Sequence, residues 1–196
     1  MSELEFLASS ARIPIANIAA VDISQRSIET IRLAGVDGVR LDVSSADLPY
    51  SSGSFSCVIM SEVIEHLLDP DHALIECRRV LSPSGTLILT TPNLAAWFNR
   101  IALLIGFQPI YTETGMELVH GRGPLVKASR PVGHVHLFTL HALKPLLRSN
   151  GLQVVQVLGL AYEGKEKNNP ILGGVDRVFS GIPELAAGLL VTCVVA

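Results

Sequence analysis

Residues 55–93 constrain the fold more than any other part of the chain. They contain two apolar runs rich in β-branched residues, 57–60 and 86–91, each as long as a strand of a parallel sheet that is buried on both faces. The residues between the two runs have the composition of a helix. The order strand, helix, strand predicts one βαβ unit and hence an α/β fold.

The signals at both ends of this helix are local. Asp69 predicts its N-cap and Pro70 its first residue, and the sequence Pro83-Ser84-Gly85 predicts its end. Between these signals, the apolar residues form one stripe on the helix, consisting of Ala73, Leu74, Cys77, Val80 and Leu81.

Polar side chains gather where the two predicted strands end. In open α/β sheets, ligands bind at the carboxyl ends of the strands. Six residues fall at those ends, namely Ser61, Glu62, Glu65, His66, Thr91 and Asn93. We therefore expect the chemistry of the protein at this edge of the sheet.

Several short motifs occur in a family-specific order, namely Asp47-Leu48-Pro49-Tyr50, Ser54-Phe55, Glu62-Val63-Ile64-Glu65-His66-Leu67, Arg79-Val80-Leu81-Ser82-Pro83 with Gly85, and Thr91-Pro92-Asn93. This pattern resembles the second half of class I S-adenosylmethionine-dependent methyltransferases, in the broad group that includes the ubiquinone-type enzymes. The resemblance covers residues 3–93 well and residues 134–160 moderately.

The resemblance implies a Rossmann-like methyltransferase sheet, mostly parallel, whose last strand (185–196) lies antiparallel beside residues 152–160. Members of the family open with a strand and a Gly-rich turn that wraps the methionine part of the cofactor. This sequence has neither, and instead starts with a predicted helix over residues 3–12. We therefore expect a fold without its first strand and Gly-rich turn, trimmed at both ends. Ser56 and Ser84 stand where relatives usually have Asp and Gly.

Composition narrows the class of protein. The 196 residues suit one domain with one core, which carries a substrate-side insertion at about 94–135. A net charge of −3 gives no basic excess for nucleic acid. The uncharged apolar stretches 101–107 and 185–196 are shorter than the ~20 residues of a membrane-spanning helix. Three single cysteines in apolar runs (Cys57, Cys77 and Cys193) indicate reduced core residues and a cytoplasmic protein.

Six residues are candidates for binding S-adenosylmethionine. Asp22 ends a buried apolar strand, where a carboxylate can accept both hydroxyls of a ribose; its alternative role is to cap the next helix, for which Ser24 is better placed. Ile23 is expected against the adenine face. The resemblance implies that Asp42 and Val43 contact the adenine edge, with Asp47 as a competing candidate. Ser61 and Glu62 are expected to flank the methionine end.

Methyl transfer from a sulfonium needs positioning, and a base only where the acceptor must lose a proton. We expect the methylation of an oxygen of a small molecule. Among the candidate bases, His66 follows a central strand, and His134 and His136 follow the insertion, where the family builds its substrate pocket. His120 and His141 are weaker candidates, since His141 lies in a predicted helix and is expected to be exposed.

The string Glu62-x-x-Glu65-His66 has a second interpretation. If it turns helically, both carboxylates and the imidazole lie on one face and suit a divalent metal ion, with His134 or His136 as fourth ligand. The string resembles the metal site of small-RNA 2′-O-methyltransferases. In metal-free relatives, however, the first Glu orders the cofactor pocket, and the second Glu and the His hold the loop.

Two other functions compete with a working methyltransferase. A degenerate fold without catalysis could act as an interaction module, which the absent Gly-rich turn would favour. A dehydrogenase is the other α/β alternative, but the phosphate-binding glycines that it requires are absent. Within the insertion, residues 95–107 predict an amphipathic helix that either packs over the active site or lies at a lipid interface.

Overall fold

The computed structural model describes residues 13–123, 129–162 and 170–196. The chain forms two compact units, Met1–Leu48 and Pro49–Ala196, each of which is considered by itself. The predicted helix at 3–12 lies outside the described residues.

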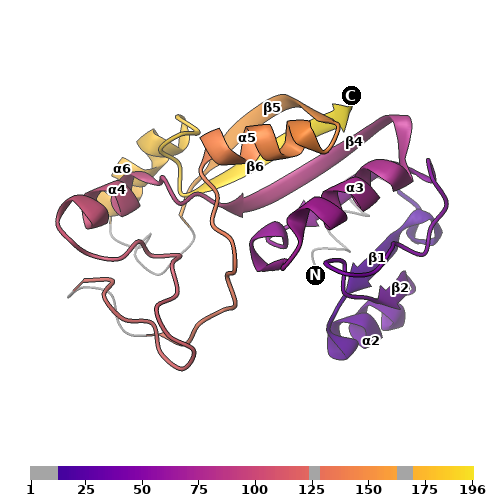
Figure 1. Cartoon of the computed structure of the whole chain (residues 1–196), viewed down its shortest axis with the longest axis horizontal. Helices are drawn as coiled ribbons and strands as arrows, with labels where there is room; N and C mark the ends of the chain where they lie inside the picture. The colour runs from indigo at the N-terminus through magenta and orange to yellow at the C-terminus, as the bar shows by residue number, and fades with distance from the viewer. Residues whose placement is uncertain (1–12, 124–128, 163–169) are drawn as a thin grey trace. The chain divides into compact units, whose positions relative to one another are not determined.

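The first unit is a small parallel βαβ arrangement, coloured indigo in Figure 1. A short 3-10 helix, η1 (Ile15–Asn17), precedes β1 (Ala19–Asp22), α2 (Gln25–Leu33) and β2 (Asp37–Arg40). The two strands pair in parallel, so their carboxyl ends lie at the same edge. The predicted cap of α2 is confirmed, because Ser24 accepts the Ser27 N–H at 3.3 Å.

The second unit contains a four-stranded sheet in the order β3-β4-β6-β5. Its elements follow the chain in this order: β3 (Phe55–Ser61), η2 (Ile64–His66), α3 (Pro70–Val80), β4 (Leu81–Pro92), α4 (Trp97–Leu104), α5 (Leu140–Ser149), β5 (Leu152–Leu160), α6 (Pro170–Ser180) and β6 (Gly188–Val195). β3 and β4 are parallel, whereas β6 runs antiparallel between β4 and β5. The expected sheet with an antiparallel last strand is confirmed, and α3 and α5 pack along β4 and β5 (Figure 1).

The βαβ unit differs from its prediction at the end of the helix. Asp69 caps α3 as predicted, accepting the His72 N–H at 2.9 Å. The helix ends at Val80, earlier than predicted, because Leu81 already has an extended backbone and pairs with Phe55. Pro83 disfavours a helical conformation for the residue before it, which helps to stop the helix. Residues 82–85 become a bulge in β4, since the next pair is Cys57 with Thr86.

β3 is less buried than a central parallel strand was expected to be. Met60 is its buried residue, while the side chain of Ile59 is 48% exposed and Cys57 is exposed. Within the described residues, β3 pairs only with β4. The expectation that all three cysteines lie in the core is therefore wrong for Cys57, although Cys77 and Cys193 are buried.

The core of the second unit lies on one face of β4 and β6. Leu87 and Leu89 alternate along β4 with half-buried residues, and Leu189 and Val191 do so along β6. Leu143 is among the fully buried residues of α5. This helix continues through Pro145, and Thr139 caps it by accepting the Ala142 N–H at 3.2 Å.

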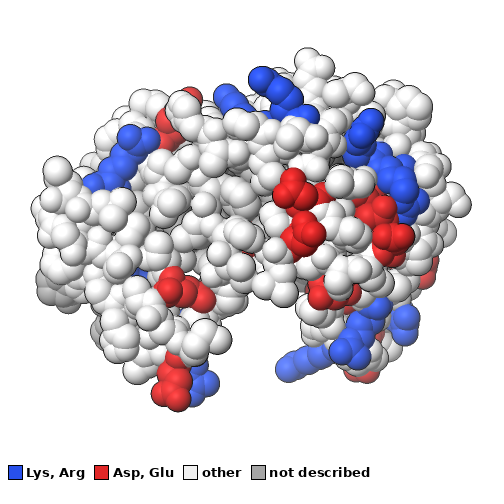
Figure 2. All heavy atoms as spheres, viewed as in Figure 1, with Lys and Arg blue, Asp and Glu red and all other residues white. Residues whose placement is uncertain are grey.

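The described part of the insertion, residues 94–123 and 129–135, holds one helix, α4, within the predicted range of 95–107. The apolar residues at the end of this helix are largely open, since Ile101, Leu104 and Ile105 are all at least half exposed. Among the described residues, no helix is long and apolar enough to cross a bilayer. On the face seen in Figure 2, acidic and basic side chains are interspersed and no broad basic surface forms.

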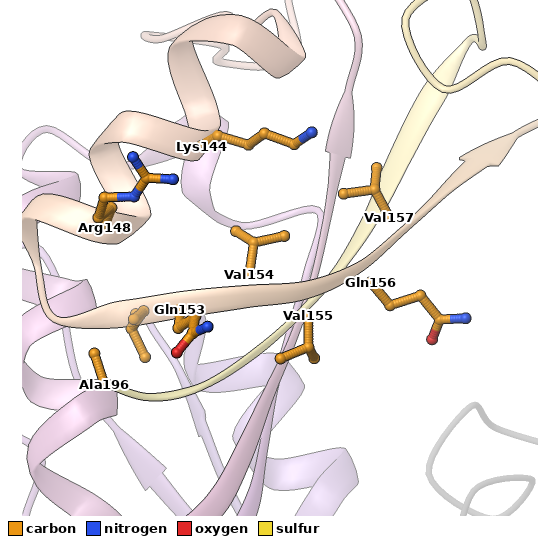
Figure 3. A pocket seen from close by; sticks show the side chains of 9 residues that line it. Lys144, Arg148, Gln153, Val154, Val155, Gln156, Val157 and Ala196 are labelled. Carbon is orange, nitrogen blue, oxygen red and sulfur yellow. The ribbon is translucent and has the colours of Figure 1, made fainter.

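A cavity of about 680 Å³ lies between α5 and β5, at the edge of the sheet. Figure 3 shows Lys144 and Arg148 projecting from α5 above the strand, with Val154 and Val157 facing the helix. The lining residues come from α5, β5 and Ala196, and none of them is a candidate site residue. This cavity is therefore separate from the predicted chemistry.

The ion pair between Arg79 and Glu76 stabilises the second unit. The guanidinium donates to both carboxylate oxygens of the buried Glu76 at 2.7 Å and to the Tyr50 carbonyl at 2.7 Å. Removing the guanidinium by Arg79→Ala leaves a buried carboxylate without its cation. We expect the free energy of unfolding to fall by about 3 kcal/mol, measured by urea denaturation.

The control for this experiment is the neighbouring, exposed Arg78. The Arg78→Ala variant should stay within about 0.5 kcal/mol of the wild type. Equal losses of stability in the two variants would show that the ion pair with Glu76 contributes no more to the free energy of unfolding than an exposed arginine does.

Candidate functional site

Asp22 and Asp42 follow the two strands of the first unit at their shared carboxyl edge. Asp22 is the last residue of β1, and its Oδ1 accepts the Ser24 N–H at 2.7 Å. Asp42 lies two residues beyond β2, and its Oδ1 accepts the Ser44 N–H at 2.9 Å. Both carboxylates are half-buried and each holds its own turn, which orients it at the end of its strand. A carboxylate so held retains lone pairs that can accept ribose or amino groups.

The two apolar candidates beside these carboxylates differ in exposure. The side chain of Ile23 is 63% exposed, which leaves an apolar surface next to Asp22. The carbonyl of Ile23 accepts the Arg40 Nε–H at 3.1 Å, which ties it to β2. Val43 is half-buried beside Asp42.

In the second unit, Ser61 and Glu62 end β3 beside the carboxyl half of β4. The Ser61 hydroxyl lies 3.1 Å from the hydroxyl of Thr90, and the Glu62 N–H donates to the Thr90 carbonyl and hydroxyl, both at 3.1 Å. Glu62 has a φ of 52°, the left-handed region that L-residues with a side chain rarely adopt, and is the one non-glycine residue with positive φ in the described chain. Such strained positions concentrate at functional sites.

Glu65 is completely buried in η2. Its Oε2 accepts the Thr91 hydroxyl at 3.0 Å, while its Oε1 is buried without a hydrogen-bond partner. Burial raises the pKa of this carboxyl to about 7, and the nearby Glu62 charge adds to the effect against the hydrogen bonds that lower it. Glu65 therefore has an oxygen that requires a proton or a cation.

His66 and His134 both donate from Nδ1 to a backbone carbonyl. The His66 Nδ1 lies 2.9 Å from the Gly133 oxygen, and the His134 Nδ1 lies 3.0 Å from the Tyr111 oxygen. Because a carbonyl can only accept, each neutral ring carries its proton on Nδ1. Each Nε2 is then left with a lone pair, the state required of a metal ligand or a general base.

The side chains of Glu65, His66 and His134 converge. Glu65, His66 and His134 each offer a ligand atom within 4.8 Å of the others, and the Glu65 Oε1 lies 3.9 Å from the His66 Nε2. Two imidazoles and a carboxylate suit a borderline divalent ion. The structure thus brings together three of the four predicted metal ligands, all of them from the second unit. Glu62 does not belong to this group.

The remaining histidines lie in different surroundings. The His136 N–H donates to the Glu65 carbonyl at 3.0 Å, and its Nε2 is buried without a partner. His141 is exposed on α5, as predicted. His120 is also exposed, and its backbone N–H donates to the Thr114 hydroxyl at 2.8 Å. Only His136 of these three adjoins the buried Glu65.

Two residues of the insertion belong to this region although no sequence pattern indicated them. Tyr111 supplies the carbonyl that orients His134, and burial raises the pKa of its phenol. Glu113 accepts backbone N–H groups of the segment that carries His134. Aromatic rings extend from here, since Phe98 lies 6.2 Å from Tyr111 and 5.5 Å from Tyr162 between ring centroids.

Comparison with known proteins identifies the family. A family profile described as a methyltransferase domain matches residues 4–157. The chain belongs to the methyltransferase domain family. Its members use S-adenosylmethionine, so the recognition made from the sequence motifs is confirmed.

A curated relative agrees with this assignment, and solved structures share the fold. The chain is 35% identical over 154 residues to a ubiquinone biosynthesis O-methyltransferase of Xanthomonas oryzae, an alignment of 76% of the chain and 58% of that relative. A SAM-dependent methyltransferase of Thermotoga maritima superposes with a TM-score of 0.61 at 18% identity, over 97% of this chain and 77% of that one. One from Listeria monocytogenes gives 0.62 at 12% identity, over 98% and 85% of the two chains. The chain spans less than two thirds of the length of the curated relatives it matches.

The raised pKa of Glu65 makes stability depend on pH. In the metal-free chain the folded state holds this proton from about pH 4.5 to about pH 7, whereas the unfolded state has lost it. Stability should therefore fall as the pH rises through this window, by up to about 3 kcal/mol. In the Glu65→Gln variant, whose side chain is always neutral, the free energy of unfolding should decrease less between pH 5 and pH 8 than in the wild type. Urea denaturation in EDTA at both pH values measures this difference.

The exposed Glu117 provides the control, because Glu117→Gln removes the same charge without changing the buried carboxyl. Its pH dependence should match the wild type. A constant free-energy difference between wild type and Glu65→Gln at both pH values would contradict the raised pKa.

Proposed function

We propose that this chain binds S-adenosylmethionine and methylates an oxygen of a small-molecule acceptor. The observation that carries the proposal is the pair of imidazoles whose Nδ1 protons are donated to carbonyls, which leaves each Nε2 able to take a proton. The names of the curated relatives, ubiquinone biosynthesis O-methyltransferases, support oxygen as the acceptor atom.

The candidate residues fit the cofactor chemically. Asp22 and Asp42 offer oriented carboxylates at the end of a parallel pair of strands, which suits the ribose hydroxyls and the adenine amino group. Exposed Ile23 and half-buried Val43 offer apolar surface for the ring. Ser61 and the strained Glu62 offer polar groups for the methionine end.

The protein's part in the reaction is positioning and removal of a proton. When bound, S-adenosylmethionine supplies a methyl group attached to a positively charged sulfur, and the sulfur is left as a neutral thioether once the methyl group is transferred. The Nε2 of His66 or His134 accepts the proton of the acceptor hydroxyl as the new oxygen–carbon bond forms. His136 adjoins this pair through Glu65 and is the third candidate base. Thr91 and the two carbonyl acceptors hold Glu65 and the rings in place.

The alternative of a non-catalytic interaction module receives less support. A fold that had lost its chemistry would not need a strained Glu62, a buried Glu65 and two histidines of defined tautomer at one sheet edge. Free cysteines at positions 57, 77 and 193 support a reducing compartment, and we propose the cytoplasm.

A divalent metal ion is a second candidate for the same residues. The observation in its favour is the buried, unpartnered Oε1 of Glu65, which lies 3.9 Å from the His66 Nε2, with His134 in the same cluster. We propose that Glu65, His66 and His134 would hold the ion, with water completing the ligand set. The ion would polarise the acceptor hydroxyl and make its proton easier to remove.

Cofactor binding can be tested by calorimetric titration of S-adenosylhomocysteine. We expect micromolar binding by the wild type and at least a tenfold weaker affinity for Asp22→Ala, because the ribose hydroxyls lose their acceptor. Asp37→Ala is the matched control, since Asp37 is exposed at the amino end of β2 and should bind like the wild type. Equal affinities of all three proteins would remove Asp22 from the site.

Metal binding can be tested with Zn²⁺ or Mn²⁺ added to EDTA-treated protein. Wild type should bind one equivalent, and His134→Ala should bind at least tenfold more weakly because one of three ligands is lost. The exposed His141 provides the control, and His141→Ala should keep the wild-type affinity. If His134→Ala and wild type bind alike, the ion lies elsewhere.

A further inference from the structure

Glu113 lies in the insertion, apart from every motif of the family, yet it contacts the segment that carries His134. We infer that Glu113 is a positioning residue that fixes the tautomers of His66 and His134. The inference rests on the proposed role of these two imidazoles, whether as bases or as metal ligands.

The Glu113 carboxylate binds consecutive backbone N–H groups. Its Oε1 accepts from Val132 at 2.5 Å and from Gly133 at 3.1 Å, and its Oε2 accepts from Gly133 at 3.2 Å. The His134 N–H contributes as well. Three successive N–H groups around one residue of positive φ form a concave anion-binding nest, and here the anion is a side chain of the same chain.

The nest requires a glycine at its centre. Gly133 has a φ of 93°, a conformation that residues with a side chain rarely adopt. This turn aims the Gly133 carbonyl at the His66 Nδ1, 2.9 Å away. The carboxylate that holds the Gly133 N–H thus holds the peptide whose oxygen orients His66.

The same short segment orients the second imidazole. Tyr111, two residues before Glu113, accepts the His134 Nδ1–H through its carbonyl at 3.0 Å. Residues 111–113 therefore hold residues 132–134 at two points, once by a side chain and once by a carbonyl. With both points in place, the two rings lie 4.9 Å apart between centroids, and the His66 Nε2 lies 3.9 Å from the Glu65 Oε1.

The electrostatics favour an ionised Glu113. Slight burial opposes the charge, but the N–H groups of Val132, Gly133 and His134 outweigh it and lower the pKa of the carboxyl. Arg122 also favours the charge, and it is held nearby by the Thr112 carbonyl at 3.1 Å. A neutral glutamine at this position keeps one acceptor oxygen but adds an N–H₂ group that faces the donors of the nest.

The test compares wild type with Glu113→Gln and with Glu117→Gln, which removes the same charge from an exposed position of the same insertion. Nitrogen-15 NMR of the histidine rings at pH 8 in EDTA reports the tautomer of each neutral imidazole, with His66→Gln and His134→Gln to assign the signals. We expect Nδ1–H tautomers for both rings in wild type and Glu117→Gln. Glu113→Gln should populate the Nε2–H form of both rings.

Metal affinity gives the second readout, because losing an outer-shell partner typically weakens a site 10- to 100-fold. We expect such a loss for Glu113→Gln and none for Glu117→Gln. If wild type binds no metal while the tautomers of Glu113→Gln still change, the metal proposal fails and the inference stands. Unchanged tautomers in a folded Glu113→Gln would overturn it.

A second variant covers the case in which Glu113→Gln does not fold. Gly133→Ala strains the nest at its centre while leaving the carboxylate intact, so it should shift the tautomer of His66 in the same direction. Nδ1–H signals identical to the wild type in a folded Gly133→Ala would equally overturn the inference.

Discussion

The candidate site of the second unit depends on the burial of Glu65. Its carbonyl accepts the N–H groups of Val135 and His136, and its carboxyl accepts the Thr91 hydroxyl, so one residue ties the end of β4 to the segment beyond the insertion. A buried carboxyl is costly when charged and unpaired. The fold leaves Oε1 without a partner all the same, 3.9 Å from the His66 Nε2 and in one cluster with His134. The unpartnered buried carboxyl thus lowers the stability of the fold at the place where the reaction is expected.

The insertion supplies contacts that orient His66 and His134 and that the family motifs do not contain. His66 belongs to a recognisable string, but its ring is oriented by Gly133, and His134 is oriented by Tyr111. Glu113 links these two contacts through the backbone that it binds. Catalytic and binding residues are common on loops positioned by a rigid scaffold. Here the loop also positions a residue of the scaffold.

The sequence predicted the elements whose signals are local. Ser24 and Asp69 cap helices as expected, because a capping side chain acts on an N–H only a few residues away. The bulge at 82–85 and the exposure of Ile59 were not predicted. The bulge and the exposure both depend on which neighbouring strand pairs with β3 or β4. The residues within a strand do not determine its neighbour. Likewise, Tyr111 and Glu113 belong to a segment without periodicity, so no pattern could connect them with His134.

The sequence by itself determined the family and the strand, helix, strand order of residues 55–92, and it indicated that Asp22 and Glu62 lie where strands end. These follow from periodicity, caps and motifs, which act over a few residues along the chain. Only the tertiary structure decided which imidazole nitrogen is free, which Glu65 oxygen lacks a partner, and that Glu113 holds the turn at Gly133. Those properties arise from contacts between residues 20 to 70 positions apart, whose geometry is set by packing rather than by local sequence.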